Sequence, residues 1–523
     1  MASVTLPEIL TPGLRSWATM IVFLYSILTI EVVTAQEVTN EAGKKKKIDI
    51  TNFDTGLREA NLFKAIGNVV VKHNDAVMWC DSAYLYEKSN QVTAFSRVRI
   101  EQGDTLKLFG DYLFYDGNTE KAFVTGDVRL IDKETTLYTD ALNYNLADRV
   151  AYYNTNGKII NNDDTLRSIK GTYYSHDKMF HFSDSVRITG PDYFITADTM
   201  HYQTESEVVI FKGPTEITGD SIRVFAHQGW YDTKNKISSI WDQALVDNFK
   251  QLIEGDTLYY DEVSGYGRAN GNVSITDTAN NSVVTGNKAI YNKEPENIFV
   301  TEHALYMMAG ESDTLYMHAD TLRSISITDQ ADTALTYRLV RAYYGTRVYS
   351  HDFQSKCDSL AYSFRDSTIR MYGQPVIWSE ENQLTADSVT LFTRNNRMDR
   401  MELYSSSFVT SQVDSIRFNQ IKGRSLTGFF SENKLYKVVV EGNGESIYYL
   451  IEEDELVGVN YSKSSTIEIL VDDGKIRQVT EFGNPDGNLD PPLLKKPDEQ
   501  RLQGFRWLNL LRPLDKQDVF RGN

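Results

Sequence analysis

The sequence predicts an all-β protein, an extended repeat-built β-jelly-roll or β-solenoid of two facing antiparallel sheets. A short motif returns about every 30 residues along the chain, a spacing that is typical of stacked arrays. Between the motifs apolar and polar residues alternate, and no stretch shows sustained helical periodicity. Because strands that are apolar on one side must close against a second sheet, these observations together favour two sheets that share one core.

The repeated motif is an Asp followed two residues later by an apolar residue and usually, four residues later, by Tyr or Leu. It occurs at Asp81, Asp111, Asp140, Asp198, Asp256, Asp320, Asp358 and Asp387, with degenerate copies near Gly171, His227, Asn287 and Arg424. An Asp side chain readily accepts backbone hydrogen bonds at a turn. We therefore interpret the repeated Asp as a turn residue.

A second element lies between these motifs: a Gly-containing pair such as Gly67-Asn68, Gly126-Asp127 or Gly271-Asn272, followed by alternating apolar residues. We interpret the pair as a turn and the alternation as a strand with one apolar face. Each repeat is then expected to supply two or three short strands. The alternating pairs are Val69/Val71, Val98/Ile100, Val128/Leu130, Val186/Ile188 and Val273/Ile275.

The N-terminus has the pattern of an export signal over residues 1–35. Arg15 precedes the apolar stretch Trp17–Ile30, and Val33-Thr34-Ala35 is a small-residue cleavage pattern. An uncleaved membrane anchor is the alternative interpretation. A polar linker is expected over residues 36–51.

The rest of the chain divides by the regularity of the repeat. A regular array is expected over 52–291 and a looser continuation over 292–431. A C-terminal β section over 432–483 and an irregular, Pro-containing tail over 484–523 follow.

Charge and cysteine content exclude two classes of protein. The net charge of −18 argues against a nucleic-acid partner, which needs a basic surface. Both cysteines, Cys80 and Cys357, directly precede a repeat Asp, in a slot that elsewhere holds small residues. They are expected to be small buried residues, many repeats apart and too distant for a disulfide.

Catalytic and metal-binding signatures are weak, so the sequence predicts neither an enzyme nor a metal or other cofactor. His176 and His181 lack a third ligand at a suitable spacing. Ser175-His176-Asp177 and Ser350-His351-Asp352 are expected to be turns, because adjacent residues on a strand point to opposite faces and cannot form a triad. One Asp per repeat does not match the dense Gly-Asp nonapeptides of calcium-binding β-rolls.

Four segments carry a resemblance to the LptA/OstA family of lipopolysaccharide-transport proteins: Gly67–Val71, Cys80–Tyr86, Gly110–Tyr115 and Val124–Leu130. The likeness covers about residues 52–290 and continues more weakly to about 430. Their order and repetition, more than any single motif, make the match specific.

The resemblance implies a jelly roll with an open edge, exported to the periplasm, that carries the lipid A part of lipopolysaccharide to the outer membrane. It also implies two partners, an inner-membrane extraction complex and an outer-membrane translocon, and end-to-end self-association. An apolar groove could shield acyl chains without catalysis, since each methylene gains about 0.8 kcal/mol on burial.

The candidate groove-lining residues are Val69, Val71, Val98, Ile100, Val128, Leu130, Val186 and Ile188. Two interpretations of these positions remain open, an open lipid groove or a closed core. Two other functions also remain open: an exported structural or adhesive β-solenoid, and a polysaccharide-acting β-helix enzyme. The enzyme needs clustered acidic and basic groups on one face, and no such cluster recurs in the sequence.

Overall fold

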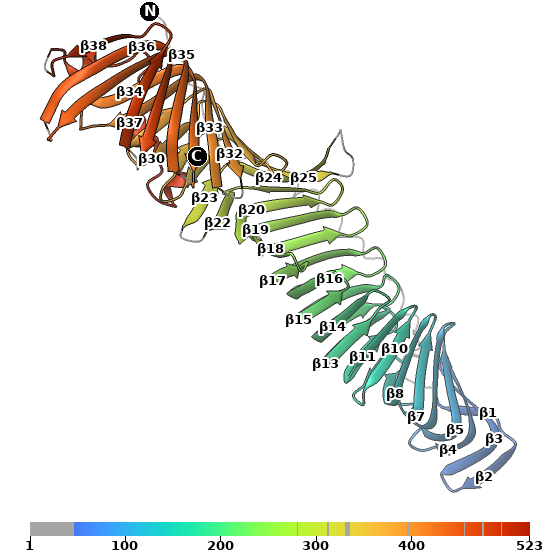
Figure 1. The fold of residues 1–523 in the computed structure, drawn as a ribbon. Helices are drawn as coiled ribbons and strands as arrows, with labels where there is room; N and C mark the ends of the chain where they lie inside the picture. Colours follow the sequence, from blue (N-terminus) through green and yellow to red (C-terminus); the bar gives the residue numbers. More distant parts are fainter. Residues whose placement is uncertain are drawn as a thin grey trace, which may run out of the picture. The chain divides into compact units, whose positions relative to one another are not determined.

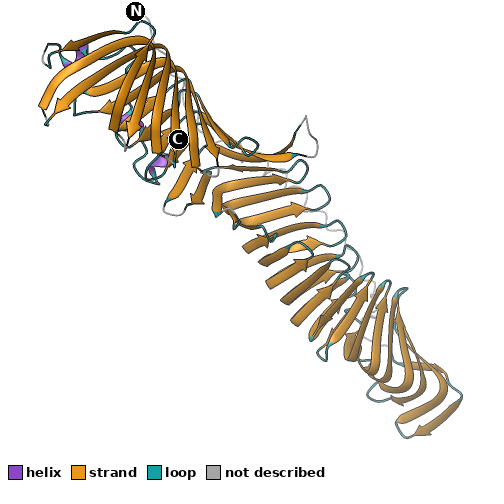
Figure 2. Ribbon diagram, viewed as in Figure 1, coloured by secondary structure: helices purple, strands orange, loops and turns teal. Residues whose placement is uncertain are grey.

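The computed structural model describes residues 47–522 apart from 280, 311–312, 330–334, 395–396, 433, 454, 473–474 and 493. The expected signal peptide (1–35) and most of the expected linker (36–46) lie outside the described residues. What is described is almost entirely strand, so the predicted all-β class is confirmed (Figure 2).

The first strands are β1 (Asp49–Asn52), β2 (Thr55–Glu59), β3 (Leu62–His73), β4 (Ala76–Tyr86), β5 (Gln91–Gln102), β6 (Leu106–Asp116), β7 (Lys121–Asp132), β8 (Thr135–Asn145), β9 (Val150–Tyr153), β10 (Gly157–Asn161), β11 (Asp164–Ser168), β12 (Lys170–Tyr174), β13 (Met179–Thr189), β14 (Tyr193–Gln203), β15 (Val208–Gly219), β16 (Arg223–Asp232), β17 (Ile237–Asp247), β18 (Gln251–Asp261), β19 (Tyr266–Asp277) and β20 (Ser282–Asn292).

The later strands are β21 (Asn297–Thr301), β22 (Leu305–Ala309), β23 (Thr314–His318), β24 (Thr321–Thr328), β25 (Thr336–Tyr343), β26 (Arg347–Tyr349), β27 (Gln354–Lys356), β28 (Ser359–Ser363), β29 (Thr368–Tyr372), β30 (Val376–Ser379), β31 (Asn382–Thr385), β32 (Ser388–Arg394), β33 (Arg397–Gln412), β34 (Phe418–Ser431), β35 (Lys434–Glu452), β36 (Glu455–Asp472), β37 (Lys475–Phe482) and β38 (Asp486–Asp490). Three 3₁₀ turns follow: η1 (Pro497–Glu499), η2 (Asn509–Leu511) and η3 (Asp518–Phe520). Among the described residues, no helix has the length and apolarity to cross a membrane.

The strands form two facing antiparallel sheets, as predicted. Where strands are long, each pairs with the next in sequence, as from β3 to β8 and from β13 to β20 (Figure 1). Between these runs β8 pairs with both β9 and β10, and two separate tracks continue, β9 to β12 and β10 to β11, until β13 rejoins them. The two tracks are the two sheets, and a long strand passes through both.

A bulge near the middle of every second long strand makes this passage possible. In β3 the pairing with β4 shifts between Ile66 and Val69, where Gly67 and Asn68 both have positive φ, +82° and +46°. A bulge with positive φ bends the strand sharply. The residues before the bend therefore lie in one sheet, here the first sheet, and those after it lie in the second sheet.

This bend corrects two expectations. Gly67-Asn68 is not a turn between strands but lies inside β3, and the two short strands expected around it are one strand of 12 residues. In the long strands the repeat Asp is not at a turn either: Asp81 lies within β4 and accepts hydrogen bonds from Arg97, at 2.6 Å from Nη2, in the bend of β5. Asn272 bonds Asp256 at 3.1 Å in the same way. The sequence marks a bend and a turn with the same residue types, which is why periodicity did not separate them.

One core runs through the array. A single cluster of buried apolar residues extends from Ile48 to Ile469 and draws on both sheets, for example on Ala65 before the bend of β3 and Val69 after it. Each repeat thus completes its core only against its neighbours, as expected of stacked repeats.

The C-terminal tail packs against the outer face of a sheet through two buried glutamines. Gln383 in β31 donates to the Arg506 carbonyl at 2.7 Å and accepts from the Leu508 amide at 2.6 Å. Gln420 in β34 donates to the Gln500 carbonyl at 3.0 Å and accepts from the Leu502 amide at 2.9 Å. Each side-chain amide thus satisfies one donor and one acceptor of an irregular segment, as a neighbouring strand would.

Candidate functional site

The eight predicted lining residues all lie on the inner face of the second sheet. They come from β3, β5, β7 and β13, follow the bend in each strand, and are at most 2% exposed. Their neighbours in sequence, such as Arg99, Arg129 and Arg187, point away from the core. The structure therefore brings the eight positions together on one apolar surface that is covered by the first sheet.

The two sheets join at the bends along one side, and tyrosines connect their free ends along the other. Tyr144, near the end of β8 in the first sheet, donates to Gln102, at the end of β5 in the second sheet, at 2.6 Å. Four such pairs, which we call the tyrosine latches, succeed one another along the array: His73–Tyr115 (2.7 Å), Gln102–Tyr144 (2.6 Å), Asp132–Tyr173 (2.8 Å) and Asn161–Tyr202 (3.0 Å). Burial raises the pKa of all four tyrosine hydroxyls, which therefore stay protonated.

The latch at Asp132 also contains an ion pair. Burial acts to raise the pKa of Asp132, but hydrogen bonds from Lys178, Thr105 and Tyr173 outweigh it, so that the pKa lies below its ordinary value. Lys178 contacts the carboxylate at 2.6 Å. A buried carboxylate with this many donors is ionised at neutral pH and holds the two sheets together firmly.

Beyond β14 the latch tyrosines lose their partner. The partners lie 41 or 42 residues before each tyrosine. For Tyr231 and Tyr260 the corresponding residues are Gly190 and Gly219, which have no side chain to accept a hydrogen bond. The ring of Tyr193 occupies the space beside Gly190 and packs edge-on against Tyr231, at 5.6 Å between centroids. The tyrosine register continues here, but the hydrogen bond at the tyrosine position does not; the sheets are connected instead by the Tyr193–Tyr231 contact and by an ion pair between Lys236 and Asp192.

The inner face becomes more exposed over the same strands. Ile100 and Ile188, in the latched part, are fully buried. Their counterparts in β16, β17, β18 and β20 are only half-buried: Val224, Val246, Ile253 and Val284. Lining residues in this part were not identified from the sequence. Alternation predicts that a side chain faces inward but does not predict how exposed it is. The signal in the sequence that could have identified this part is the presence of Gly190 and Gly219 at the positions of the latch partners.

Other chemistry is limited in the described part of the chain. His, Cys, Asp and Glu residues form no group of three that could hold a metal ion there. Ser175-His176-Asp177 lies in the turn after β12, and Ser350-His351-Asp352 in the loop after β26, so both are turns as expected. Cys80 and Cys357 are buried free thiols, and burial raises the pKa of each to about 12.

Comparison with known proteins supports one family. Residues 45–198 match the family model described as OstA-like protein. Among solved structures, the chain is similar to LptH from Pseudomonas aeruginosa, the LptA-homologous periplasmic component of a lipopolysaccharide transport device. The identity is 16%, the match covers 27% of this chain and 95% of LptH, and the TM-score is 0.21. The comparison with curated proteins finds no match.

The family match spans the bent strands β3 to β13 and three of the four tyrosine latches, since Tyr202 of the fourth lies beyond residue 198. Residues 45–198 are therefore similar to OstA-like proteins, and the predicted resemblance to the LptA/OstA family is confirmed.

Proposed function

We propose that the chain is a periplasmic carrier that holds the acyl chains of lipopolysaccharide between its two sheets on the way to the outer membrane. The family match supplies the lipid class, and the continuous apolar inner face supplies a place for acyl chains. Its partners would be an inner-membrane extraction complex, which loads it, and an outer-membrane translocon, which receives the lipid. End-to-end contact between copies would extend the same inner face.

The observation that carries this proposal is the set of half-buried inner-face residues in β16, β17, β18 and β20. A folded protein seldom leaves inward-facing Val and Ile in contact with water, because exposed apolar surface costs about 25 cal/mol per Å². Val224, Val246 and Ile253 are half-buried, whereas the corresponding inward positions of the latched part are buried. An acyl chain that packs along these three side chains would cover their exposed apolar surface and remove it from water.

The latches give the carrier a means to extend the groove. Each latch in β3–β14 is a hydrogen bond between the free ends of the sheets; such a bond contributes about 1 kcal/mol net, and about 1.5–3 kcal/mol where the partner is the charged Asp132. A lipid that gains about 0.8 kcal/mol for each buried methylene outweighs one latch with a few methylenes. We therefore infer that acyl chains enter at β16–β20 and separate the latches in turn. Val69, Val71, Val98, Ile100, Val128, Leu130, Val186 and Ile188 would then line the groove.

Photocrosslinking tests the proposal. A photoreactive residue is placed at Val246 or Ile253, and at Val128 or Ile188 in the latched part, and the purified full chain is incubated with radiolabelled lipopolysaccharide. Glu254, exposed and directly next to Ile253, is the matched outward control. Adducts are expected at Val246 and Ile253, fewer at Val128 and Ile188, and none at Glu254.

Two crosslinking results would contradict the proposal. If the folded protein gives no adduct at any inward position, or as many at Glu254 as at Ile253, the inner face is a closed core. The structural or adhesive role would then be the better account of the repeats.

A further inference from the structure

A row of cations and aromatic rings crosses the outer face of the second sheet. Each member is the direct register partner of the next on the neighbouring strand, from β4 to β13. The members of this cation–aromatic row are, in order, Trp79, Arg99, Phe109, Arg129, Tyr138, Lys158, Arg167 and Arg187. Direct cross-strand partners have Cβ atoms about 4.5–5.5 Å apart, so the row is continuous.

Four of its cations lack a countercharge. Arg99 contacts Glu101, whereas Arg129, Lys158, Arg167 and Arg187 are exposed and form no ion pair with any carboxylate in the described part of the chain. Lys158, Arg167 and Arg187 are successive partners, and like charges directly opposite each other destabilise a sheet. In a protein of net charge −18, a row of unpaired cations is the exception. A bound anion would remove the repulsion.

The aromatic members hold the row in place and offer a stacking face. The Arg99 guanidinium lies 4.9 Å from the Trp79 ring centre, and that of Arg129 lies 4.7 Å from the Phe109 ring centre. A stacked guanidinium keeps its N–H groups free at the edge, where they can donate in pairs to a phosphate or carboxylate. Tyr138, between Arg129 and Lys158 in the row, is 41% exposed.

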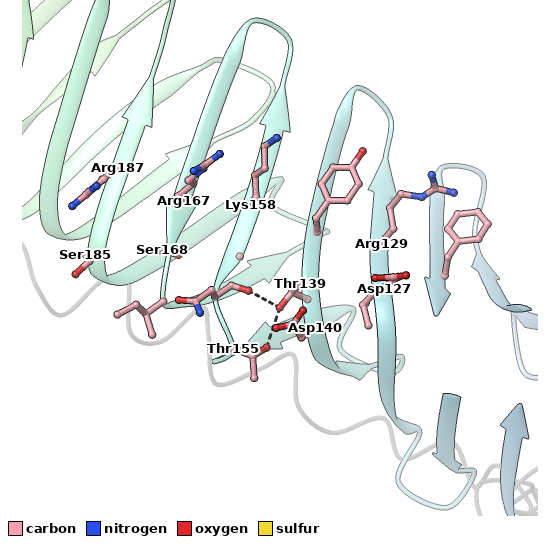
Figure 3. A pocket seen from close by; sticks show the side chains of 16 residues that line it. Asp127, Arg129, Thr139, Asp140, Thr155, Lys158, Arg167, Ser168, Ser185 and Arg187 are labelled. Atoms are coloured by element: carbon pink, nitrogen blue, oxygen red, sulfur yellow. Dashed lines mark hydrogen bonds between the residues drawn. The ribbon is translucent and has the colours of Figure 1, made fainter. Parts of the chain in front are cut away.

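The row borders a cavity of about 890 Å³ at the bend of the sheets (Figure 3). Figure 3 shows Arg129, Lys158, Arg167 and Arg187 side by side along one wall. The other side is polar and comes from the bend: Asp127, Thr139, Asp140, Thr155, Asn156, Ser168 and Ser185. The volume lies within the range of small-ligand sites, about 300–1,000 Å³.

Local structure explains the hollow. Here the strand is interrupted between Tyr153 at the end of β9 and Gly157 at the start of β10, instead of passing through a bulge. The Tyr153 ring packs against Gly157 and Gly171, leaving no room for a Cβ at either glycine. Thr139 donates to the Asn156 carbonyl at 2.7 Å and fixes the intervening segment. The cavity is thus formed by ordered contacts.

We propose that the cation–aromatic row and this cavity bind an anionic saccharide whose rings carry phosphate or carboxylate groups. Arg167 and Arg187 would receive the anion, Tyr138 would stack on a sugar ring, and Asp127 and Asp140 would accept hydrogen bonds from sugar hydroxyls. The two carboxylates favour a saccharide over a polyanionic peptide, which would meet like charge there and has no hydroxyls to donate. This site is on the outer face and is independent of the lipid groove proposed above.

Binding measurements on the full chain test the site with four defined probes. Hexagalacturonate carries carboxylates, pentamannosyl phosphate carries a phosphate, maltohexaose is neutral, and hexaglutamate is an acidic peptide. The two anionic sugars distinguish which anion is preferred, and tight binding of either supports the proposal. The double variant Arg167→Gln/Arg187→Gln should weaken that binding roughly tenfold or more, since two charge-assisted contacts are lost.

Arg268→Gln is the matched control, because Arg268 is exposed on β19, away from the row, and forms no ion pair with the described residues. It should leave affinity within about twofold of the parent, because a distant surface charge is screened. The double variant should have a melting temperature at least as high as the parent, since it relieves repulsion, so lost binding cannot be attributed to unfolding. The site is overturned if neither anionic sugar binds at millimolar concentration. Equally tight binding of maltohexaose or hexaglutamate, or an equal loss in Arg268→Gln, also contradicts it.

Discussion

Gly126 lies directly across the bend from Asp111, and a Cβ atom on Gly126 would be 2.7 Å from the Cβ of Asp111. Gly126 also has φ +83°, which L-residues rarely adopt. The two conspicuous residues of the repeat, Asp and Gly, therefore face each other on neighbouring strands at the same bend, which we call the corner. The same arrangement recurs at Asp54–Gly67, Asp256–Gly271 and Asp358–Gly373.

This corner predicts that Gly126→Ala lowers the free energy of unfolding by about 1–3 kcal/mol, from backbone strain and the clash with Asp111. Urea unfolding followed by circular dichroism measures the change. Gly213→Ala in β15 is the control, because a Cβ there has no neighbour within 4 Å. Similar losses in the two variants would show that any strand glycine is equally sensitive, and that the corner has no special role.

The latches predict an effect on both stability and lipid access. Tyr144→Phe removes the hydrogen bond to Gln102, and the stability should fall by about 1–2 kcal/mol. Photocrosslinking of lipopolysaccharide at Val128 should rise at the same time, because the sheets separate more easily. Tyr152→Phe, on an exposed tyrosine of β9, should change neither quantity. A stability loss without increased crosslinking would show that the latches do not control lipid entry.

A stacked histidine pair predicts acid sensitivity well above the carboxylate range. The His181 and His201 rings lie 3.6 Å apart, with Lys212 nearby and Tyr174 against His181. Burial, then the charges of His181 and Lys212, lowers the pKa of His201 to about 4 from an ordinary value of 6.5. Between these values the unfolded chain binds more protons, so stability should fall as the pH drops from 6.5 towards 4 and then level off.

Midpoints of urea unfolding, measured across that pH range, give the slope of stability against pH. His201→Gln should reduce this slope, because one of the two groups that bind extra protons on unfolding is gone, while His181, whose pKa burial also lowers, keeps its share. His176→Gln, in an exposed turn, should retain it. An unchanged slope in His201→Gln would assign the acid sensitivity to other groups.

The tail contacts predict that Gln383→Ala releases the C-terminal segment. The change leaves the Arg506 carbonyl and the Leu508 amide without their partners, at a cost of about 2–3 kcal/mol. Limited trypsin digestion should then cleave the tail after Arg506 and Lys516 faster, as seen by mass spectrometry. Gln478→Ala, on the exposed face of β37, is the control. Equal digestion rates would mean that the tail is held mainly by its apolar contacts.

Much of this architecture could be predicted from periodicity. The alternation at Val98/Ile100 and Val128/Leu130 predicts inward-facing strand positions, and all four are buried. The tail was predicted only as irregular, because the bonds from Gln383 and Gln420 join residues 80 or more positions away from them. Such long-range pairs leave no local pattern in a single sequence.

The repeat, the all-β class and the inward set of apolar residues follow from the chain alone, because side-chain alternation is a local property of a strand. Whether the space between the sheets is closed or accessible depends on pairs such as Gln102–Tyr144. Tyr260 lacks such a partner, because Gly219 occupies the corresponding position. The cation–aromatic row likewise exists only once eight residues from different strands meet in register. Both features depend on which strands lie side by side, and only folding brings those residues into contact.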